Sequence, residues 1–323
     1  MSEHATLWVL FGILVTALLA YDIGVVERRS GTLSFGQACR RSAALVGIAL
    51  LFGLAILRYL GPERALEYYA GYLIELSLSV DNLFVFILIF QYFHVPAAHQ
   101  PRVLRWGILG AMVMRGLMIA AGVLLLQRFE WIIFIFGAIL VATAIRLFGA
   151  HSGFDPERNL AIRLARRLLP MTAGFEGRRF FVRTGRRLQV TPLLVVVLVV
   201  EWTDLVFAVD SIPAIFAVTR DPFVVYSSNV LAVLGLRALY FLLAGMLDRF
   251  HYLKPAIALI LLFVGAKMLA DPWVHVPVAW SLAVVVSTLA VAVTASCLRA
   301  RRHGVSPASP EPGVGPATPS LDP

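Results

Sequence analysis

The chain has 323 residues, of which 59% are hydrophobic and 15% are charged, and its mean hydropathy is +0.83. Soluble domains carry about 25% charged residues, so this composition excludes an ordinary soluble protein and indicates a membrane protein. The net charge of +9 does not indicate a nucleic-acid partner, because the basic side chains are distributed as a membrane topology requires.

Nine apolar segments follow one another along the chain, and each is long enough to cross a bilayer, which takes about 20 helical residues. The first begins at MSEHATLWVL, which lacks the basic region of a signal peptide, so we expect an uncleaved first span. The segments cover roughly residues 5–26, 42–60, 68–90, 104–127, 130–148, 190–218, 223–247, 253–270 and 277–298. The sequence therefore predicts an all-α polytopic membrane protein, with a transmembrane domain over residues 1–303.

The basic residues predict the orientation of this domain. Of the 28 Lys and Arg side chains, 20 lie in segments that follow odd-numbered spans, including nine arginines between Arg158 and Arg187. The positive-inside rule then places the N-terminus outside and the C-terminus in the cytoplasm. We expect an Arg-rich cytoplasmic loop over residues 150–188, with an amphipathic helix near ERNLAIRLARRLL on anionic lipid. The Pro-rich residues 304–323 are predicted to be disordered.

The third and sixth apolar segments contain similar acidic stretches, ELSLSVDNLFVFILIF from residue 75 and DLVFAVDSIPAIF from residue 204. At an offset of 129 residues they match Glu75 with Asp204, Asp81 with Asp210, and Asn82 with Ser211. The two helices after each stretch also resemble each other, so spans 3–5 recur as spans 6–8. Because three spans are an odd number, the second copy enters the membrane from the opposite side. The sequence predicts an inverted 3+3 repeat, as in many secondary transporters.

The repeated segments carry more acidic side chains than a membrane helix normally tolerates. A carboxylate at the centre of a bilayer costs about 2.5 to 3.5 kcal/mol. Carboxylates with nearby hydroxyl and amide oxygens suit a hard divalent cation such as Mn²⁺, Mg²⁺ or Ca²⁺. All seven histidines lie in predicted loops, tails or helix ends, which disfavours zinc or copper. The candidate metal ligands are Glu75, Asp81, Asn82, Glu201, Asp204, Asp210 and Ser211.

Helical geometry complicates this prediction. In a continuous helix Asp81 points about 120° away from Glu75, so one ion could not reach every acid. Pro213 cannot donate a hydrogen bond to the carbonyl of Val209, and a kink there would free that carbonyl as a ligand. The sixth segment is also long, at about 29 residues, so tilt, a break or a re-entrant section would each accommodate it.

Two arginines also fall inside predicted spans, Arg115 in MRGLMIAAG and Arg237 in LRALYFLLAG. Each can be a structural counter-ion that joins two helices, or it can pair with a site carboxylate when a cation has left. Asp22 can be a residue of the helix end or a further member of the site. Two arginines cannot neutralise the five acids of the candidate site, so the surplus indicates cations, protons or both.

Three stretches together resemble a known family: ELSLSVDNLFVF, EWTDLVFAVDSIPAIFAVT and SSNVLAVLGLRALYFLLAGM. They are similar to the signatures of the TerC family of integral membrane proteins, which includes the Alx-type proteins. The similarity runs from about Tyr21 to Leu269, and YDIGVVERR resembles the family's first helix. The family was named for tellurium resistance. The resemblance implies Mn²⁺ export at the acidic positions, with Asn229 beside them, in the inner membrane of a bacterial cell.

Two functions of different classes remain open. One is a secondary transporter that moves Mn²⁺ outward, coupled to protons. The other is a membrane scaffold without transport activity in a complex that resists metal or tellurite stress. We expect no enzyme and no cofactor, because the chain has no GxxxxGK[ST] motif and no nucleophile with a positioned base.

Overall fold

The computed structural model describes residues 3–22, 35–129, 131–149, 172, 174–177, 179–184, 187–244, 252–274 and 276–302. Two predicted features lie outside the described residues. These are the amphipathic helix near ERNLAIRLARRLL and the disordered tail over residues 304–323.

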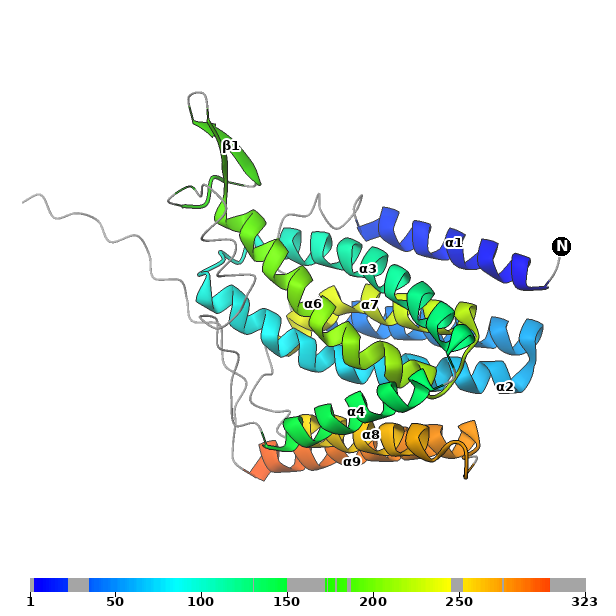
Figure 1. The fold of residues 1–323 in the computed structure, drawn as a ribbon. Helices are drawn as coiled ribbons and strands as arrows, with labels where there is room; N and C mark the ends of the chain where they lie inside the picture. Colours follow the sequence, from blue (N-terminus) through cyan, green and yellow to red (C-terminus); the bar gives the residue numbers. More distant parts are fainter. Residues whose placement is uncertain are drawn as a thin grey trace, which may run out of the picture.

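The described chain is mainly helical, and its helices coincide with the predicted spans. Six of them are long and apolar enough to cross a membrane, and α4 and α8 are shorter apolar helices. The helices are α1 (Glu3–Tyr21), α2 (Phe35–Tyr92), α3 (Gln100–Arg128), α4 (Ile132–Gly149), α6 (Pro192–Phe216), α7 (Pro222–Ala244), α8 (Leu253–Ala270) and α9 (Val278–Arg302). Figure 1 shows these helices gathered in one bundle, and their length and apolar composition confirm a polytopic membrane protein.

Helix α2 contains both the second and the third predicted span. Its backbone leaves helical geometry at Gly61, where φ is 87° and ψ is 176°, directly before Pro62. Glycine adopts a positive φ without steric cost, and proline removes a donor at the bend. The two legs then fold back on each other, and the hydroxyl of Tyr68 donates to the carbonyl of Ala49 at 2.9 Å. The chain therefore crosses the bundle twice within α2.

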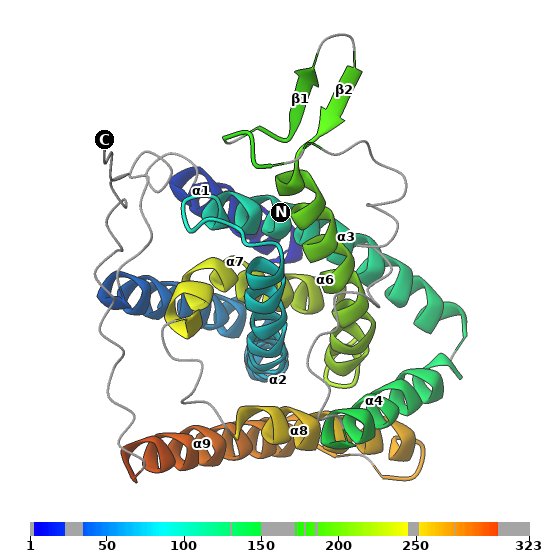
Figure 2. The same cartoon turned by 90° about the vertical axis from the view of Figure 1, so that its left-hand side faces the viewer.

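The helices pack in pairs that bring the repeated segments together. Helix α2 contacts α6 and α7, and α3 also contacts α6 and α7. Helix α4 packs on α8, which also contacts α9. Figure 2 shows α4, α8 and α9 on one side of the bundle, away from α1. The two acidic helices therefore lie in the interior, between the other members of the bundle.

The described chain is all-α, as predicted, apart from one short pair of strands. Strands β1 (Phe181–Thr184) and β2 (Arg187–Val190) form an antiparallel pair in which Phe181 faces Val190 and Thr184 faces Arg187. They lie at the end of the segment predicted as an Arg-rich loop, where it meets the sixth predicted span, and the strand pair projects from one end of the bundle (Figure 1). The stretch FVRTGRRLQV has a glycine between two short runs that contain valine, which is a hairpin signal.

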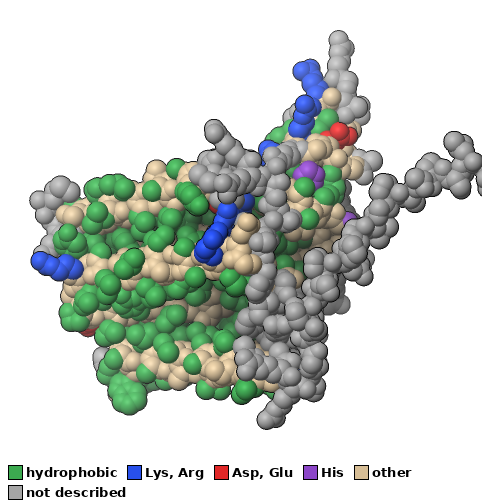
Figure 3. Space-filling model, turned by 180° about the vertical axis from the view of Figure 1, so that it is seen from behind, with side chains coloured by type: hydrophobic (Ala, Val, Ile, Leu, Met, Phe, Trp, Pro, Cys, Tyr) green, Lys and Arg blue, Asp and Glu red, His purple; other side chains and the backbone are tan. Residues whose placement is uncertain are grey.

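The surface of the bundle suits a lipid environment. Large apolar side chains are exposed on several helices, such as Val113, Leu117 and Leu124 on α3, which are 66%, 69% and 65% exposed. Hydrophobic side chains are spread over the visible face of the bundle in Figure 3, where few charged side chains appear. An apolar surface of this extent exceeds what a soluble monomer exposes.

Candidate functional site

A buried arginine lies at the centre of the interior polar cluster. Arg115 of α3 has an exposed fraction of 0%. Its Nε donates to Oδ2 of Asp204 at 3.0 Å, and its Nη2 donates to Oδ1 of the same carboxylate at 2.9 Å. These two parallel bonds form the bidentate pair that arginine and carboxylate favour. The pair joins α3 to α6 in the interior of the bundle.

A second carboxylate contacts the same guanidinium. Nη1 of Arg115 donates to Oε1 of Glu75 on α2, and that side chain is also 0% exposed. The amide of Asn229 on α7 donates to Oε2 of Glu75 at 3.0 Å. The hydroxyl of Ser79 lies 3.4 Å from Oε1. Both oxygens of Glu75 therefore have donors, and four helices contribute to the cluster.

Two further oxygens lie at the edge of hydrogen-bonding distance from Nη1 of Arg115. Oγ of Ser211 is at 3.4 Å and Oδ1 of Asn229 is at 3.5 Å. We call six side chains the Arg115 cluster: Glu75, Ser79, Arg115, Asp204, Ser211 and Asn229. Each is at most 2% exposed. The cluster thus presents carboxylate, hydroxyl and amide oxygens in a space closed to bulk solvent.

The charges of the Arg115 cluster do not balance. One guanidinium faces two carboxylates. Burial of an unpaired charge in a low-dielectric interior costs several kcal/mol, so a buried charge normally has a partner. A proton or a bound cation would supply the missing positive charge. The oxygen donors fit a hard cation.

The structure does not bring Asp210 into this cluster. Helix α6 is continuous through Pro213, so of the three alternatives for this long segment a break is not observed. Asp204 and Ser211 are seven residues apart and share a face, because seven residues are about two turns. Asp210 lies on a different face, and it accepts a hydrogen bond from the hydroxyl of Thr143 on α4 at 2.7 Å. The prediction that it shares one ion with the other acids lacks support for this reason.

Three candidate ligands remain, Glu201, Asn82 and Asp81. Glu201 is one turn before Asp204 and half-buried, and its carboxylate fills the space beside Gly110 of α3. Asn82 is buried on α2. Asp81 lies in α2, but its side chain is outside the described part of the structure. Among the described residues no three His, Cys, Asp or Glu side chains gather as metal ligands, so metal binding stays a prediction.

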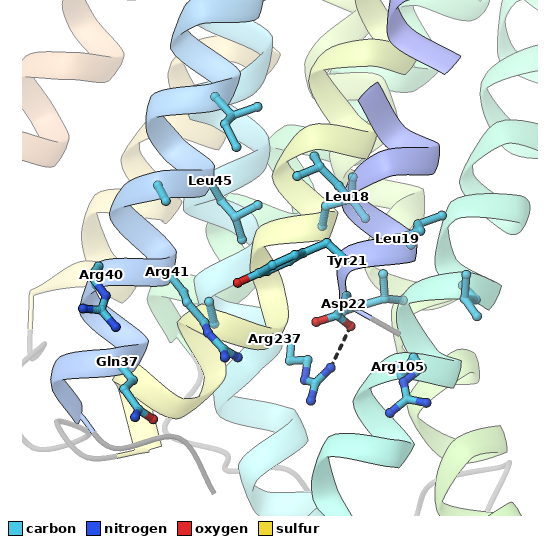
Figure 4. Close-up of a pocket in the computed structure, with 16 residues that line it drawn as sticks. Leu18, Leu19, Tyr21, Asp22, Gln37, Arg40, Arg41, Leu45, Arg105 and Arg237 are labelled. Carbon is cyan, nitrogen blue, oxygen red and sulfur yellow. Dashed lines mark hydrogen bonds and ion pairs between the residues drawn. The ribbon is translucent and has the colours of Figure 1, made fainter. Parts of the chain in front are cut away.

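The two arginines of the repeat have different partners. Arg237 on α7 donates from Nη1 to Oδ2 of Asp22, at the end of α1, at 2.7 Å. Figure 4 shows this pair in a pocket lined by other arginines, and none of the residues of the Arg115 cluster lines that pocket. Arg115 therefore pairs with site carboxylates as expected, whereas Arg237 pairs with the acid of the first helix.

The structure also reveals a buried acid that the sequence analysis did not single out. Glu67 is 7% exposed. Its Oε2 accepts from Nη1 of Arg64 at 2.7 Å and from the hydroxyl of Thr219 at 2.6 Å. Arg64 and Glu67 are three residues apart, which is a recognisable helical ion pair. These bonds join α2 to the turn between α6 and α7.

Comparison with known proteins agrees with this architecture. The family model described as "Integral membrane protein TerC family" matches residues 60–304. The "Uncharacterized membrane protein STKORF319" of Myxococcus xanthus is 47% identical over 304 residues, which cover 94% of this chain and 95% of that protein. The "Putative membrane-bound redox modulator Alx" of Escherichia coli (strain K12) is 46% identical over 295 residues, which cover 88% and 91%. No solved structure matches. The chain belongs to the TerC family of integral membrane proteins.

Proposed function

We propose that the protein is a secondary transporter that exports a divalent cation, with Mn²⁺ as its substrate, and that the Arg115 cluster is its binding site. The supporting observation is the surplus negative charge of Glu75 and Asp204 around one guanidinium, inside the membrane domain. Intramembrane ionisable groups are costly and typically mark ion pathways. The oxygen donors of the cluster favour Mn²⁺ over softer metals.

In this proposal Arg115 acts as an internal substitute for the substrate. Without metal, its guanidinium neutralises one of the two carboxylate charges through direct bonds to Glu75 and Asp204. An arriving Mn²⁺ competes for the same oxygens, so the guanidinium has to withdraw from at least one carboxylate. When the metal leaves, the guanidinium returns, and a proton on the surplus carboxylate completes the neutralisation. Metal export is thereby coupled to proton entry.

The packing of the helices supports an inverted repeat around this site. Glu75 and Asp204, the two acids that contact Arg115, occupy matched positions of the acidic stretches. The first copy of the acidic helix packs on α7, and the second packs on α3. The third helices of the two units, α4 and α8, pack on each other. A site between two inverted halves is the arrangement from which secondary transporters gain alternating access.

A redox role is the second candidate, because the names of the Escherichia coli relatives describe a redox modulator. The chain has two cysteines, Cys39 and Cys297. If thiol chemistry drives the activity, a Cys39→Ser/Cys297→Ser variant loses it. If the carboxylate cluster carries the activity, this variant transports Mn²⁺ like the wild type.

Flux into proteoliposomes tests the proposal directly. We expect purified wild-type protein to move Mn²⁺ across the membrane when a pH gradient is imposed, and Glu75→Gln to be inactive, since it removes a charge that the substrate needs. Asp271→Asn is the matched control, because Asp271 is a partly exposed acid at the end of α8. Folded wild-type protein that moves no divalent metal would favour the scaffold function.

A further inference from the structure

A second polar site lies at one end of the bundle, where α1, α2, α3 and α7 enclose a pocket of about 470 Å³. Figure 4 shows its lining, with Leu18 and Leu45 toward one end and Arg41, Arg105 and Arg237 toward the other. Pockets of about 300 to 1,000 Å³ hold small organic ligands. The pocket is therefore large enough for part of an amphiphilic molecule.

Among the residues that the structure describes, the polar end of the pocket is lined by more basic than acidic side chains. Four arginines line it, Arg40, Arg41, Arg105 and Arg237, and the acid among the lining residues is Asp22. Asp22 is already bonded to Arg237. The positive charges of Arg105 and Arg41 both repel the guanidinium of Arg237. An anionic group would relieve this mutual repulsion.

A buried donor in the pocket also points to a ligand. Arg237 is 7% exposed, and its Nη1 contacts Asp22. Its Nε is buried, yet no acceptor for it occurs among the residues that the structure describes. A buried N–H without an acceptor costs about 1 to 3 kcal/mol. An oxygen of a ligand in the pocket would satisfy this donor.

The rest of the pocket wall is apolar. On each helix the charged lining residues lie closer to the same end of the bundle than the apolar residues named below. On α2 and α3 the arginines are nearer the N-terminal end than the apolar residues Leu45 and Ile108. On α7, which runs in the opposite direction, Arg237 is nearer the C-terminal end than the apolar Leu234. The charged end therefore faces the end of the bundle, and the apolar wall extends toward its middle. A phospholipid in a leaflet has this polarity.

We propose that this pocket binds an anionic phospholipid, with its phosphate against the arginines and part of an acyl chain along Leu18, Leu45 and Ile108. Arginine suits this ligand because its planar donors match phosphate oxygens. Basic pockets between membrane helices on the cytoplasmic side are typical sites for anionic headgroups. The helix ends around this pocket carry the basic residues that the positive-inside rule assigns to that side.

Thermal melts of the purified full-length protein in a nonionic detergent test the proposal. Phosphatidylglycerol is expected to raise the melting temperature in a saturable way, because a ligand of the folded state stabilises it. Phosphatidylcholine and inorganic phosphate at equal concentrations are expected to have little effect. An equal shift with phosphatidylcholine would contradict an anion-selective lipid site, and an equal shift with inorganic phosphate would show a small-anion site instead.

Two variants test whether the stabilisation by phosphatidylglycerol comes from binding in this pocket. Arg40→Gln/Arg41→Gln is expected to weaken the apparent affinity for phosphatidylglycerol by about 30-fold, at about 1 kcal/mol for each arginine. Arg58→Gln is the control, because Arg58 lies on the same helix α2, is exposed and does not line the pocket. Unchanged affinity in the double variant, or equal losses in both variants, would overturn the proposal.

Discussion

At the scale of single residues, Arg115 is the side chain on which the interior of the bundle depends. Its fork binds both oxygens of Asp204, while its other terminal nitrogen contacts Glu75. Lysine could not replace it, because an ammonium group lacks the planar fork that binds a carboxylate with two bonds. The same guanidinium thus links three helices, α2, α3 and α6.

We expect Arg115→Met to lower the free energy of unfolding by about 3 to 5 kcal/mol, since it leaves two buried carboxylates without their partner. Saturating Mn²⁺ should restore more stability to this variant than to the wild type, because the metal no longer competes with the guanidinium. Chemical denaturation in detergent, with and without Mn²⁺, measures both effects. Arg128→Met is the control, as Arg128 is exposed at the end of the same helix. Equal Mn²⁺ effects in Arg115→Met and the wild type would contradict a cation site here.

At the scale of helices, the phase of α6 decides which acids meet. Asp204 and Ser211 both reach Arg115, whereas Asp210 bonds to Thr143 on α4. The angular separation of these acids follows from the sequence, whereas a kink at Pro213 would have freed the carbonyl of Val209 beside Asp210. Proline lies in the last turn of α6, where its ring leaves most of the helix undisturbed. The angular positions of the acids around a continuous helix therefore predict which of them reach Arg115, and a kink at Pro213 is not needed.

The packing of α4 on α8 depends on two glycines. A Cβ on Gly265 would lie 2.9 Å from Cβ of Leu140 and 3.0 Å from the carbonyl oxygen of Gly137. Small residues allow membrane helices to approach this closely. We expect Gly265→Ala to cost about 1 to 3 kcal/mol, because backbone must move to relieve the overlap.

The test compares the denaturation midpoint of Gly265→Ala with that of a control variant, Gly12→Ala. Nothing lies within 4 Å of a Cβ on Gly12 in α1, so its substitution should be neutral or slightly stabilising, as alanine favours a helix. Equal midpoints for the two variants would show that α4 and α8 do not depend on this close approach.

At the scale of the whole molecule, the apolar segments predicted the positions of the helices well, because the length of an apolar run is set by the thickness of the bilayer. The division between residues 60 and 68 coincides with the bend at Gly61. The acids around Arg115 were also predicted, through the match of Glu75 with Asp204. The partner of Arg237 was not predicted, because pairing with Asp22 on α1 depends on tertiary packing outside the repeat.

The predicted orientation of the whole domain is testable with introduced cysteines. In a Cys39→Ser/Cys297→Ser background, an impermeant thiol reagent should label Glu63→Cys in intact cells, since Glu63 is exposed beside the bend of α2. Gly174→Cys, near the strand pair, should be labelled only after permeabilisation, because the positive-inside rule places that segment in the cytoplasm. Labelling of Gly174→Cys in intact cells would show that the domain has the opposite orientation, and the proposed direction of transport would then be wrong.

The central claim is that the Arg115 cluster binds the transported cation, and two substitutions on one helix test it most directly. Asp204→Asn and Asp210→Asn make the same chemical change six residues apart in α6, but Asp204 contacts Arg115 and Asp210 contacts Thr143. The measurement is the initial rate of Mn²⁺ flux in proteoliposomes that contain equal amounts of each folded protein. We predict that Asp204→Asn abolishes the flux and that Asp210→Asn retains most of it. Wild-type flux in Asp204→Asn would contradict the assignment of the cluster as the substrate site.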